Sequence, residues 1–243
     1  MKRIGIVFVC LLIAAVLCFG ACGVRNVVDN LSSGGSTPED CFDFWSMNGG
    51  YRIAAHYRDL MPAKVILPSE HDGQNVVAIK DGGFKELTIE EVIIPSTIKT
   101  FGYEAFCNCT RLKKVTLSEG LITLDDRSFY GCESLQSIVI PNTVASLGEL
   151  TFRDCFSLTS AVLPDSLTVI DYGTFRACSS LTTVTIGSGV EKLEEYVFED
   201  CSSLSHINYR GTKEKWNSII KMQGWNDNTG NYTIHCTDGD IQK

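Results

Sequence analysis

The sequence lacks an excess of basic charge. Lysine and arginine together number 21, against 29 aspartates and glutamates, which gives a formal net charge of −8. Proteins that bind nucleic acids gather lysine and arginine to contact phosphates, whereas the longest basic cluster here is the short run from Arg111 to Lys114. We therefore expect no nucleic-acid partner.

Catalytic motifs are also missing. The sequence has no nucleophile elbow, no phosphate-cradling glycine loop and no paired-histidine metal motif. Its histidines, His56, His71, His206 and His235, fall in unrelated places, and we interpret His206 as a surface residue. Asp238-Gly239-Asp240 has part of a calcium-loop pattern without the remaining ligands, so we expect a frayed tail there. These absences predict no enzymatic activity, no cofactor and no metal.

One long apolar run is present, at the N-terminus. Lys2 and Arg3 precede an uncharged stretch of 17 residues from Ile4 to Gly20. This form predicts a secretory signal over residues 1–22, and its end resembles the bacterial lipoprotein signal, in which Cys22 would carry the lipid. The alternatives are an ordinary signal peptide or a membrane-spanning anchor, for which the run is slightly short. We expect a lipid-anchored protein on the extracellular face of the cell envelope, or a secreted one if Cys22 is not used.

Apolar residues recur every 23 residues from residue 92 onward, without an insertion. Two alternating columns are Val92, Val115, Ile138, Ala161, Val184 and Ile207, and Ile94, Leu117, Ile140, Leu163 and Ile186. Further columns are Ile98, Leu121, Val144, Leu167 and Val190; Phe101, Leu124, Leu147, Ile170 and Leu193; Phe106, Phe129, Phe152, Phe175 and Phe198; and Leu112, Leu135, Leu158, Leu181 and Leu204. Because one such unit cannot bury its apolar face alone, the pattern predicts a repeat solenoid of stacked coils.

The residue types indicate the structure of each coil. The alternating columns predict a strand whose end is marked by Pro95, Pro141 or Pro164. The second half of each coil is too short for a long helix, so we expect turns or 3-10 segments, with a second short strand near Val169-Ile170. After the repeats, Thr212 is an expected N-cap for a capping helix that continues to Gly224, and a short strand is expected over residues 232–236.

Three stretches resemble a known family. "IPSTIKTFGYEAFCNCTRL" and "LPDSLTVIDYGTFRACSSL" are similar to the BspA-like (Treponema-type) class of bacterial surface leucine-rich repeats, and "YRGTKEKWNSI" resembles its common C-terminal unit. The resemblance implies a mainly β leucine-rich repeat solenoid, extracellular and membrane-tethered, that serves as a binding or adhesion module. It does not imply a particular ligand, because a fold does not fix an activity.

Five of the eleven cysteines repeat with the same period. They are Cys109, Cys132, Cys155, Cys178 and Cys201. A zinc site needs ligands that converge on one point, whereas one cysteine per coil forms a row. Disulfides between coils are an alternative, since stacked strands lie ~4.8 Å apart and bridged Cα atoms ~4.4–6.8 Å apart. Their odd number and apolar neighbours favour buried free thiols, and the resemblance implies that this column faces loop carbonyls.

Three further cysteines stand outside this row. Cys107 shares a column with Tyr130, Arg153, Arg176 and Glu199, which predicts an exposed and oxidisable thiol. Cys41 and Cys236 flank opposite ends of the expected stack, so we expect no bridge between them.

The predicted organisation has five parts: a signal over 1–22, a flexible tether over 23–42, an N-terminal cap with an irregular first repeat over 43–91, five repeats over 92–206, and a C-terminal capping unit with a tail over 207–243. We expect Phe42, Phe44 and Trp45 to help cover the N-terminal end of the core.

The outward positions of the predicted strands form the candidate binding row. Its members are Ile93, Thr116, Val139, Val162, Thr185 and Asn208, and a flanking row holds Glu91, Lys114, Ser137, Ser160, Thr183 and His206. The candidate row is largely β-branched and uncharged, which would suit a host or envelope protein as partner but also suits sheet formation. The alternative is a structural envelope lipoprotein without a dedicated ligand.

Overall fold

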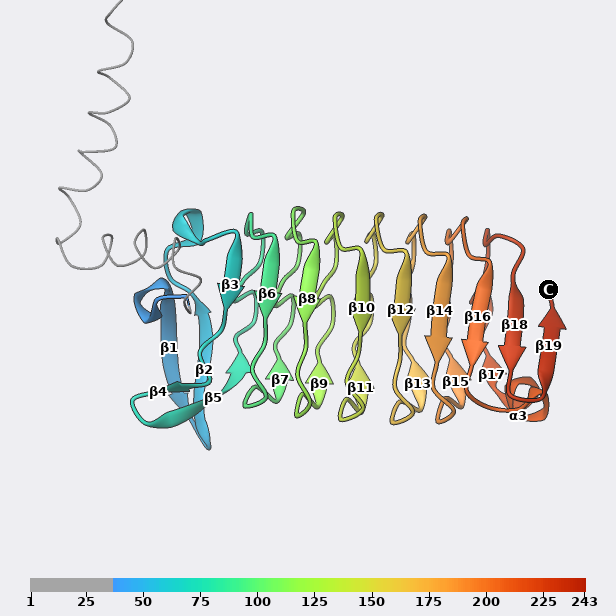
Figure 1. The fold of residues 1–243 in the computed structure, drawn as a ribbon, viewed down its shortest axis with the longest axis horizontal. Helices are drawn as coiled ribbons and strands as arrows, with labels where there is room; N and C mark the ends of the chain where they lie inside the picture. The colour runs from blue at the N-terminus through green and yellow to red at the C-terminus, as the bar shows by residue number, and fades with distance from the viewer. Residues whose placement is uncertain (1–36) are drawn as a thin grey trace, which may run out of the picture.

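The computed structural model describes residues 37–243. The predicted signal, the lipid site Cys22 and most of the predicted tether lie outside these residues. The chain forms a solenoid in which each coil contributes one strand to a long main sheet and most coils contribute a second, shorter strand (Figure 1). The predicted fold class is confirmed.

The main sheet runs the length of the stack. Its order is β19-β18-β16-β14-β12-β10-β8-β6-β3. The strands are β3 (Lys64–Ile66), β6 (Glu91–Ile93), β8 (Lys114–Thr116), β10 (Ser137–Val139), β12 (Ser160–Val162), β14 (Thr183–Ile186), β16 (His206–Tyr209), β18 (Thr233–Cys236) and β19 (Gly239–Gln242). Neighbours pair in parallel, except that β19 folds back antiparallel to β18.

The second side of the stack carries two shorter sheets. One has the order β1-β2-β5-β7-β9-β11, with β4 also pairing with β5, and the other has the order β13-β15-β17. The strands are β1 (Phe42–Met47), β2 (Gly50–Ala55), β4 (Glu70–His71), β5 (Gln74–Ile79), β7 (Thr100–Phe101), β9 (Thr123–Leu124), β11 (Ser146–Leu147), β13 (Val169–Ile170), β15 (Lys192–Leu193) and β17 (Ile220–Lys221). The strand expected at Val169-Ile170 is confirmed.

The predicted columns form the core. Almost all of them have at most 2% of their surface exposed, and the five repeat phenylalanines are completely buried. Their rings stack nearly parallel along the axis, with centroids 5.4 Å apart for Phe106 and Phe129 and 5.6 Å apart for Phe129 and Phe152. One coil therefore shields the next from water, as the period predicted.

Val115 and Leu117 are exceptions to the prediction, because both are only half-buried. They belong to the coil of β8, which pairs with β10 at the single residue pair Lys114–Ser137. The other neighbouring strands of the main sheet pair along three residues or more, as β6 and β8 do. The sheet is therefore open between β8 and β10, and this opening exposes the two side chains.

The N-terminal end is capped by a hairpin of β1 and β2. Phe42 is buried against Phe84, at a centroid distance of 6.2 Å, and Phe44 packs against the core, while Trp45 is half-buried beneath the Lys80 ammonium. Short 3-10 turns at η1 (Glu39–Cys41) and η2 (Arg58–Leu60) flank the hairpin. Cys41 is buried, and the Thr37 hydroxyl accepts a hydrogen bond from the Ile66 amide at 2.8 Å. The folded part thus begins before residue 43.

The C-terminal end is capped by the helix α3 (Lys213–Ser218) and by β18 with β19. The predicted N-cap is confirmed, because the Thr212 hydroxyl accepts from the Lys215 amide at 3.2 Å. The predicted end at Gly224 is wrong: Ile219 turns out of the helix, and Ile220 and Lys221 extend the short sheet of β15. The expected frayed tail is also wrong, since β19 pairs with β18 over four residues.

Candidate functional site

The candidate binding row lies on the outward face of the main sheet, one residue per strand. Direct pairing joins Ile93 to Thr116 across β6 and β8, and joins Val139, Val162, Thr185 and Asn208 across β10 to β16. Thr116 and Val139 are exposed, and the other four are partly exposed. The structure thus brings the row together in two segments, with the opening between β8 and β10 dividing them.

One end of this face is charged. The Glu91 carboxylate lies between two ammonium groups, 3.4 Å from Nζ of Lys64 and 3.2 Å from Nζ of Lys114. Partial burial by itself raises the pKa of Glu91, but the hydrogen bonds and charges of Lys114 and Lys64 outweigh it, so the pKa is lowered. The strands β3, β6 and β8 therefore present alternating, mutually neutralised charges.

The middle of the face is uncharged. From β10 to β14 its outward residues are serine, threonine and valine: Ser137, Val139, Ser160, Val162, Thr183 and Thr185. Val139 is 63% exposed, the largest value among the exposed large hydrophobic residues of the described chain. Because removing apolar valine surface from water is favourable, this stretch is the part of the face best suited to contact another apolar surface.

The opening between β8 and β10 adds depth to that stretch. It holds a cavity of about 260 Å³ whose lining includes Val115, Leu117, Val139 and Pro141, with Lys114 and Glu119 also on its border. In the other coils the residue equivalent to Leu117 donates its amide to the next strand, as Ile140 does to the Val162 carbonyl at 2.9 Å. Within residues 37–243 the Leu117 amide has no protein acceptor, so the cavity combines an apolar wall with an unpaired backbone donor.

Two histidines lie together at the other end of the face, and the sequence pattern did not predict their proximity. His206 on β16 and His235 on β18 lie diagonally across neighbouring strands, with Nδ1 of His206 3.0 Å from Nε2 of His235. Nδ1 of His235 is in turn 3.0 Å from Oδ1 of Asp240 on β19. The prediction that the histidines are unrelated is wrong for this pair. Aligning Thr233–His235 with His206–Asn208 as the next outward positions would have found it.

The thiol row lies at the turns that join the short second strand of each coil to the next strand of the main sheet, for example residues 102–113 between β7 and β8. We call this part of the stack the turn side. All five repeat cysteines are fully buried, and each thiol donates to the backbone carbonyl of the preceding coil's phenylalanine, at 3.0 Å from Cys109 to Phe84 and 3.3 Å from Cys155 to Phe129. All eight cysteines of the described residues are free. Burial raises the pKa of Cys109 and of Cys201 to about 12, and that of the other three upward as well. The predicted row of buried thiols facing loop carbonyls is confirmed.

Cys107 contradicts its prediction, because only 2% of it is exposed. Its column partners are long side chains that reach past the turns, whereas a thiol at the same backbone position ends below its neighbours. Burial, and then the negative charge of Glu104, raise the pKa of Cys107 to about 11. A reactive thiolate is therefore not formed near neutral pH.

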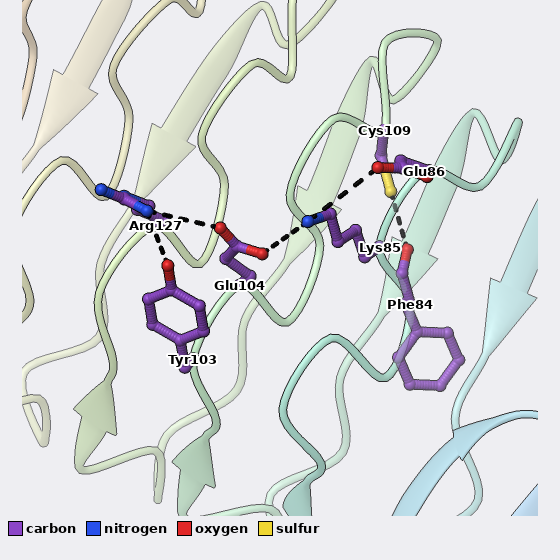
Figure 2. A network of polar contacts seen from close by, with 7 residues as sticks. All are labelled: Phe84, Lys85, Glu86, Tyr103, Glu104, Cys109 and Arg127. Atoms are coloured by element: carbon purple, nitrogen blue, oxygen red, sulfur yellow. Dashed lines mark hydrogen bonds and ion pairs between the residues drawn. The ribbon is translucent and has the colours of Figure 1, made fainter.

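A charged column covers the turns beside this thiol row (Figure 2). Glu104 lies 2.6 Å from Nζ of Lys85 and 3.6 Å from Nη1 of Arg127, and Arg127 also donates to the Tyr103 hydroxyl at 2.6 Å. The hydrogen bond from Lys85 is the main cause that lowers the pKa of Glu104. The Glu86 carboxylate lies 3.9 Å from Nζ of Lys85, so two carboxylates balance the two cations in this column.

Residues 37–243 lack two features that would point to another function. No three His, Cys, Asp or Glu side chains converge as a metal-binding group. None of the helices in this part of the chain is long and apolar enough to cross a lipid bilayer. The outward face of the main sheet is the candidate site, and the cavity and the histidine pair are its distinctive features.

Solved structures share this architecture. The leucine-rich repeat protein of T. pallidum, TpLRR, is 28% identical, with a TM-score of 0.69, over 77% of this chain and 86% of that one. A leucine-rich repeat protein from Eubacterium ventriosum is 24% identical, with a TM-score of 0.52, over 69% of this chain and 59% of that one. The pneumococcal vaccine antigen PcpA is 14% identical, with a TM-score of 0.58, over 80% of this chain and 49% of that one. The second and third likenesses are of fold alone.

No curated protein matches the sequence. The family model described as the BspA type leucine rich repeat region matches residues 77–213 in six copies. That span is more than half of the 243 residues, and it coincides with the coils that carry the buried phenylalanine and cysteine columns. The chain therefore belongs to the BspA type leucine rich repeat family.

Proposed function

We propose that the chain is a cell-surface, membrane-anchored protein that binds a host or envelope protein through the outward face of its main sheet. The observation that carries the proposal is the uncharged stretch on β10 to β14, where Val139 is 63% exposed. Rigid parallel pairing holds Val139, Val162 and Thr185 in line, so a partner would meet a preorganised surface and order few side chains on binding.

The cavity beside Val139 supports a protein partner over a small ligand. It is shallow and open at the sheet face, and its apolar wall is continuous with the uncharged stretch. An aliphatic side chain from a partner would bury there, while a partner carbonyl would accept from the Leu117 amide. The proposed contact is therefore centred on β8, β10 and β12.

Introducing a negative charge on this face tests the proposal. Val139→Glu and Val162→Glu each place a carboxylate in the proposed contact, while the buried core is unchanged. The matched control is Ile122→Glu, because Ile122 is also an exposed aliphatic residue, at 47%, and lies just before β9 on the other side of the stack. The measurement is capture of surface proteins from host cells and from the envelope fraction by each immobilised variant.

Loss of capture by the Val139 and Val162 variants, with retention by the Ile122 variant, would support the sheet face. Capture that is the same for all folded variants would refute it. No specific capture by the wild-type chain would favour the alternative, a structural envelope lipoprotein without a dedicated ligand.

The anchor is a separate part of the proposal. We expect a lipid on Cys22, which would contribute ~0.8 kcal/mol for each buried CH₂ group to membrane attachment. Mass spectrometry of the mature N-terminus tests it: a lipid-modified Cys22 supports the anchor. An unmodified N-terminus after cleavage elsewhere would mean that the protein is secreted.

A further inference from the structure

The histidine pair at the C-terminal end of the main sheet has a geometry that a simple surface position does not require. The ring centroids of His206 and His235 are 5.3 Å apart, and the planes are 27° from parallel. Most of that separation is the 3.0 Å between Nδ1 of His206 and Nε2 of His235. The two nitrogens therefore face each other edge to edge, rather than the rings stacking face to face.

Asp240 determines which nitrogen of His235 carries the proton. Its carboxylate oxygen can only accept, so Nδ1 of His235, 3.0 Å away, must be the donor. In the neutral ring, Nε2 then carries a lone pair directed at His206. A carboxylate that holds one histidine nitrogen while the other is free to coordinate is the arrangement found behind metal-bound histidines.

The backbone fixes this arrangement from both sides. Parallel pairing of β16 with β18 places Asn208 opposite His235 and His206 opposite Thr233. Antiparallel pairing of β18 with β19 places Asp240 opposite His235. The two imidazoles and the carboxylate are thus held by three adjacent strands, and the side chains of His235 and Asp240 remain partly open to solvent, at 37% and 54%.

We propose that Nδ1 of His206 and Nε2 of His235 form a surface site for a divalent transition-metal ion such as Zn²⁺. Two zinc–nitrogen bonds of 2.0–2.1 Å at a tetrahedral angle separate the nitrogens by about 3.3 Å. The pair therefore needs to open by only a few tenths of an ångström, and each ring needs to turn so that its coordinating nitrogen points at the ion, which lies off the line between the two nitrogens. His206 moves its ring proton from Nδ1 to Nε2, so no proton is lost overall, and water completes the coordination.

The other two histidines lack this geometry and serve as controls. Nδ1 of His56 lies 2.6 Å from Asp43, and Nδ1 of His71 faces Glu39, while its ring stacks on Phe44. Each is paired with an acid, but neither faces a second imidazole. A bridge between His206 and His235 would also tie the last repeat strand, β16, to the capping strand β18, so bound metal is expected to stabilise the cap.

The test is a titration of ZnCl₂ into the full chain. Binding is measured by calorimetry, and the stabilisation is measured by the change in the thermal unfolding midpoint. The wild-type chain is expected to bind one Zn²⁺ at this pair and to gain unfolding temperature. His206→Ala and His235→Ala should lose both effects, and Asp240→Asn should weaken binding about tenfold. His206→Gln keeps a hydrogen-bond donor toward His235 while removing the ligand nitrogen, so it should also lose the metal without loss of folding.

The controls are His56→Ala and His71→Ala, which should bind Zn²⁺ as the wild-type chain does. Absence of saturable Zn²⁺ binding by the wild-type chain would overturn the proposal. Equal binding by the wild-type chain and the folded His206→Gln chain would overturn it as well, because the metal would then be held elsewhere.

Discussion

Backbone hydrogen bonding between neighbouring coils is continuous along the turns of this solenoid but interrupted along its sheets. On the turn side, amides of the repeat phenylalanines donate to the next coil without a gap, as Phe106 does to Ser128 and Phe129 to Thr151, at 2.8 and 2.9 Å. The main sheet, in contrast, opens between β8 and β10, and the sheets on the second side do not pair between β11 and β13. Hydrogen bonding at the turns is therefore uninterrupted along the repeat coils, whereas that of each sheet is not.

The backbone of the turns explains their continuity. Each coil has two left-handed positions, for example Glu104 at φ 55° and Asn108 at φ 56°, or Leu150 at 56° and Asp154 at 60°. A left-handed non-glycine residue is unfavourable, but here it turns the amide toward the next coil, and Glu104 and Asn108 donate to Asp126 and Tyr130. With the turns fixed in this way, the outward sheet residues can vary without disturbing the stacking of the coils.

Alkaline pH should break the turn side with the largest effect. The five buried thiols have pKa values raised well above the ~8.5 of an unfolded chain. Between those values the unfolded state binds fewer protons, so stability is fully present below pH ~8.5 and is lost as pH rises toward the folded values. In this range each thiol lowers the free energy of unfolding by about 1.4 kcal/mol per pH unit. The five thiols together should therefore unfold the chain within one or two pH units.

Unfolding free energy measured against pH checks this slope. The control is Cys155→Ala, which removes the hydrogen bond to the Phe129 carbonyl and should cost about 1–3 kcal/mol at neutral pH while reducing the alkaline slope by one thiol. If the wild-type chain and the Cys155→Ala chain have the same slope above pH 9, the prediction is wrong, because the Cys155 thiol then titrates alike in the folded and the unfolded chain.

Truncation of one stacked ring should be the next largest effect. Phe129 is fully buried between Phe106 and Phe152, so Phe129→Ala should lower the free energy of unfolding by about 3–5 kcal/mol. Phe156, which is 44% exposed, is the matched control, and Phe156→Ala should stay within about 0.5 kcal/mol of wild type. Equal losses in urea unfolding would mean that the ring stack does not hold the coils together.

The charged column on the turns should contribute least. Glu104→Gln removes the carboxylate that accepts from Lys85 at 2.6 Å, and we expect a loss of about 0.5–1 kcal/mol at neutral pH, because the pair is partly exposed. Since the folded pKa of Glu104 is lowered, this loss should be present above pH ~4.3 and fade as pH falls below it. Glu86→Gln is the control, since its carboxylate is 3.9 Å from Lys85, and it should show no change.

The sequence predicted the coils because their apolar columns repeat every 23 residues and must be buried. It could not predict the opening at β8 and β10, because Val115 and Leu117 keep the same apolar pattern as their equivalents. It placed Cys107 in solvent because a column gives the position of Cα but not the reach of the side chain. It extended the capping helix too far because pairing of Ile220 with Lys192 on β15 outweighs the local helical pattern.

The candidate site was predicted only as a row of outward positions. All six residues lie on that face, since alternation along a strand determines which side chains point outward. The 23-residue period could not predict the histidine pair. The last coil is longer, so that His235, rather than the residue 23 positions after Asn208, lies beside Asn208.

Residue-resolved amide hydrogen exchange tests most directly whether the turns hold the stack together. We predict that the amides of Phe106, Phe129 and Phe152 exchange only on global unfolding. The Leu117 amide has no protein acceptor in residues 37–243, so it should exchange orders of magnitude faster than the Ile140 amide. Equal protection of Leu117 and Ile140, or fast exchange at the three phenylalanines, would contradict it.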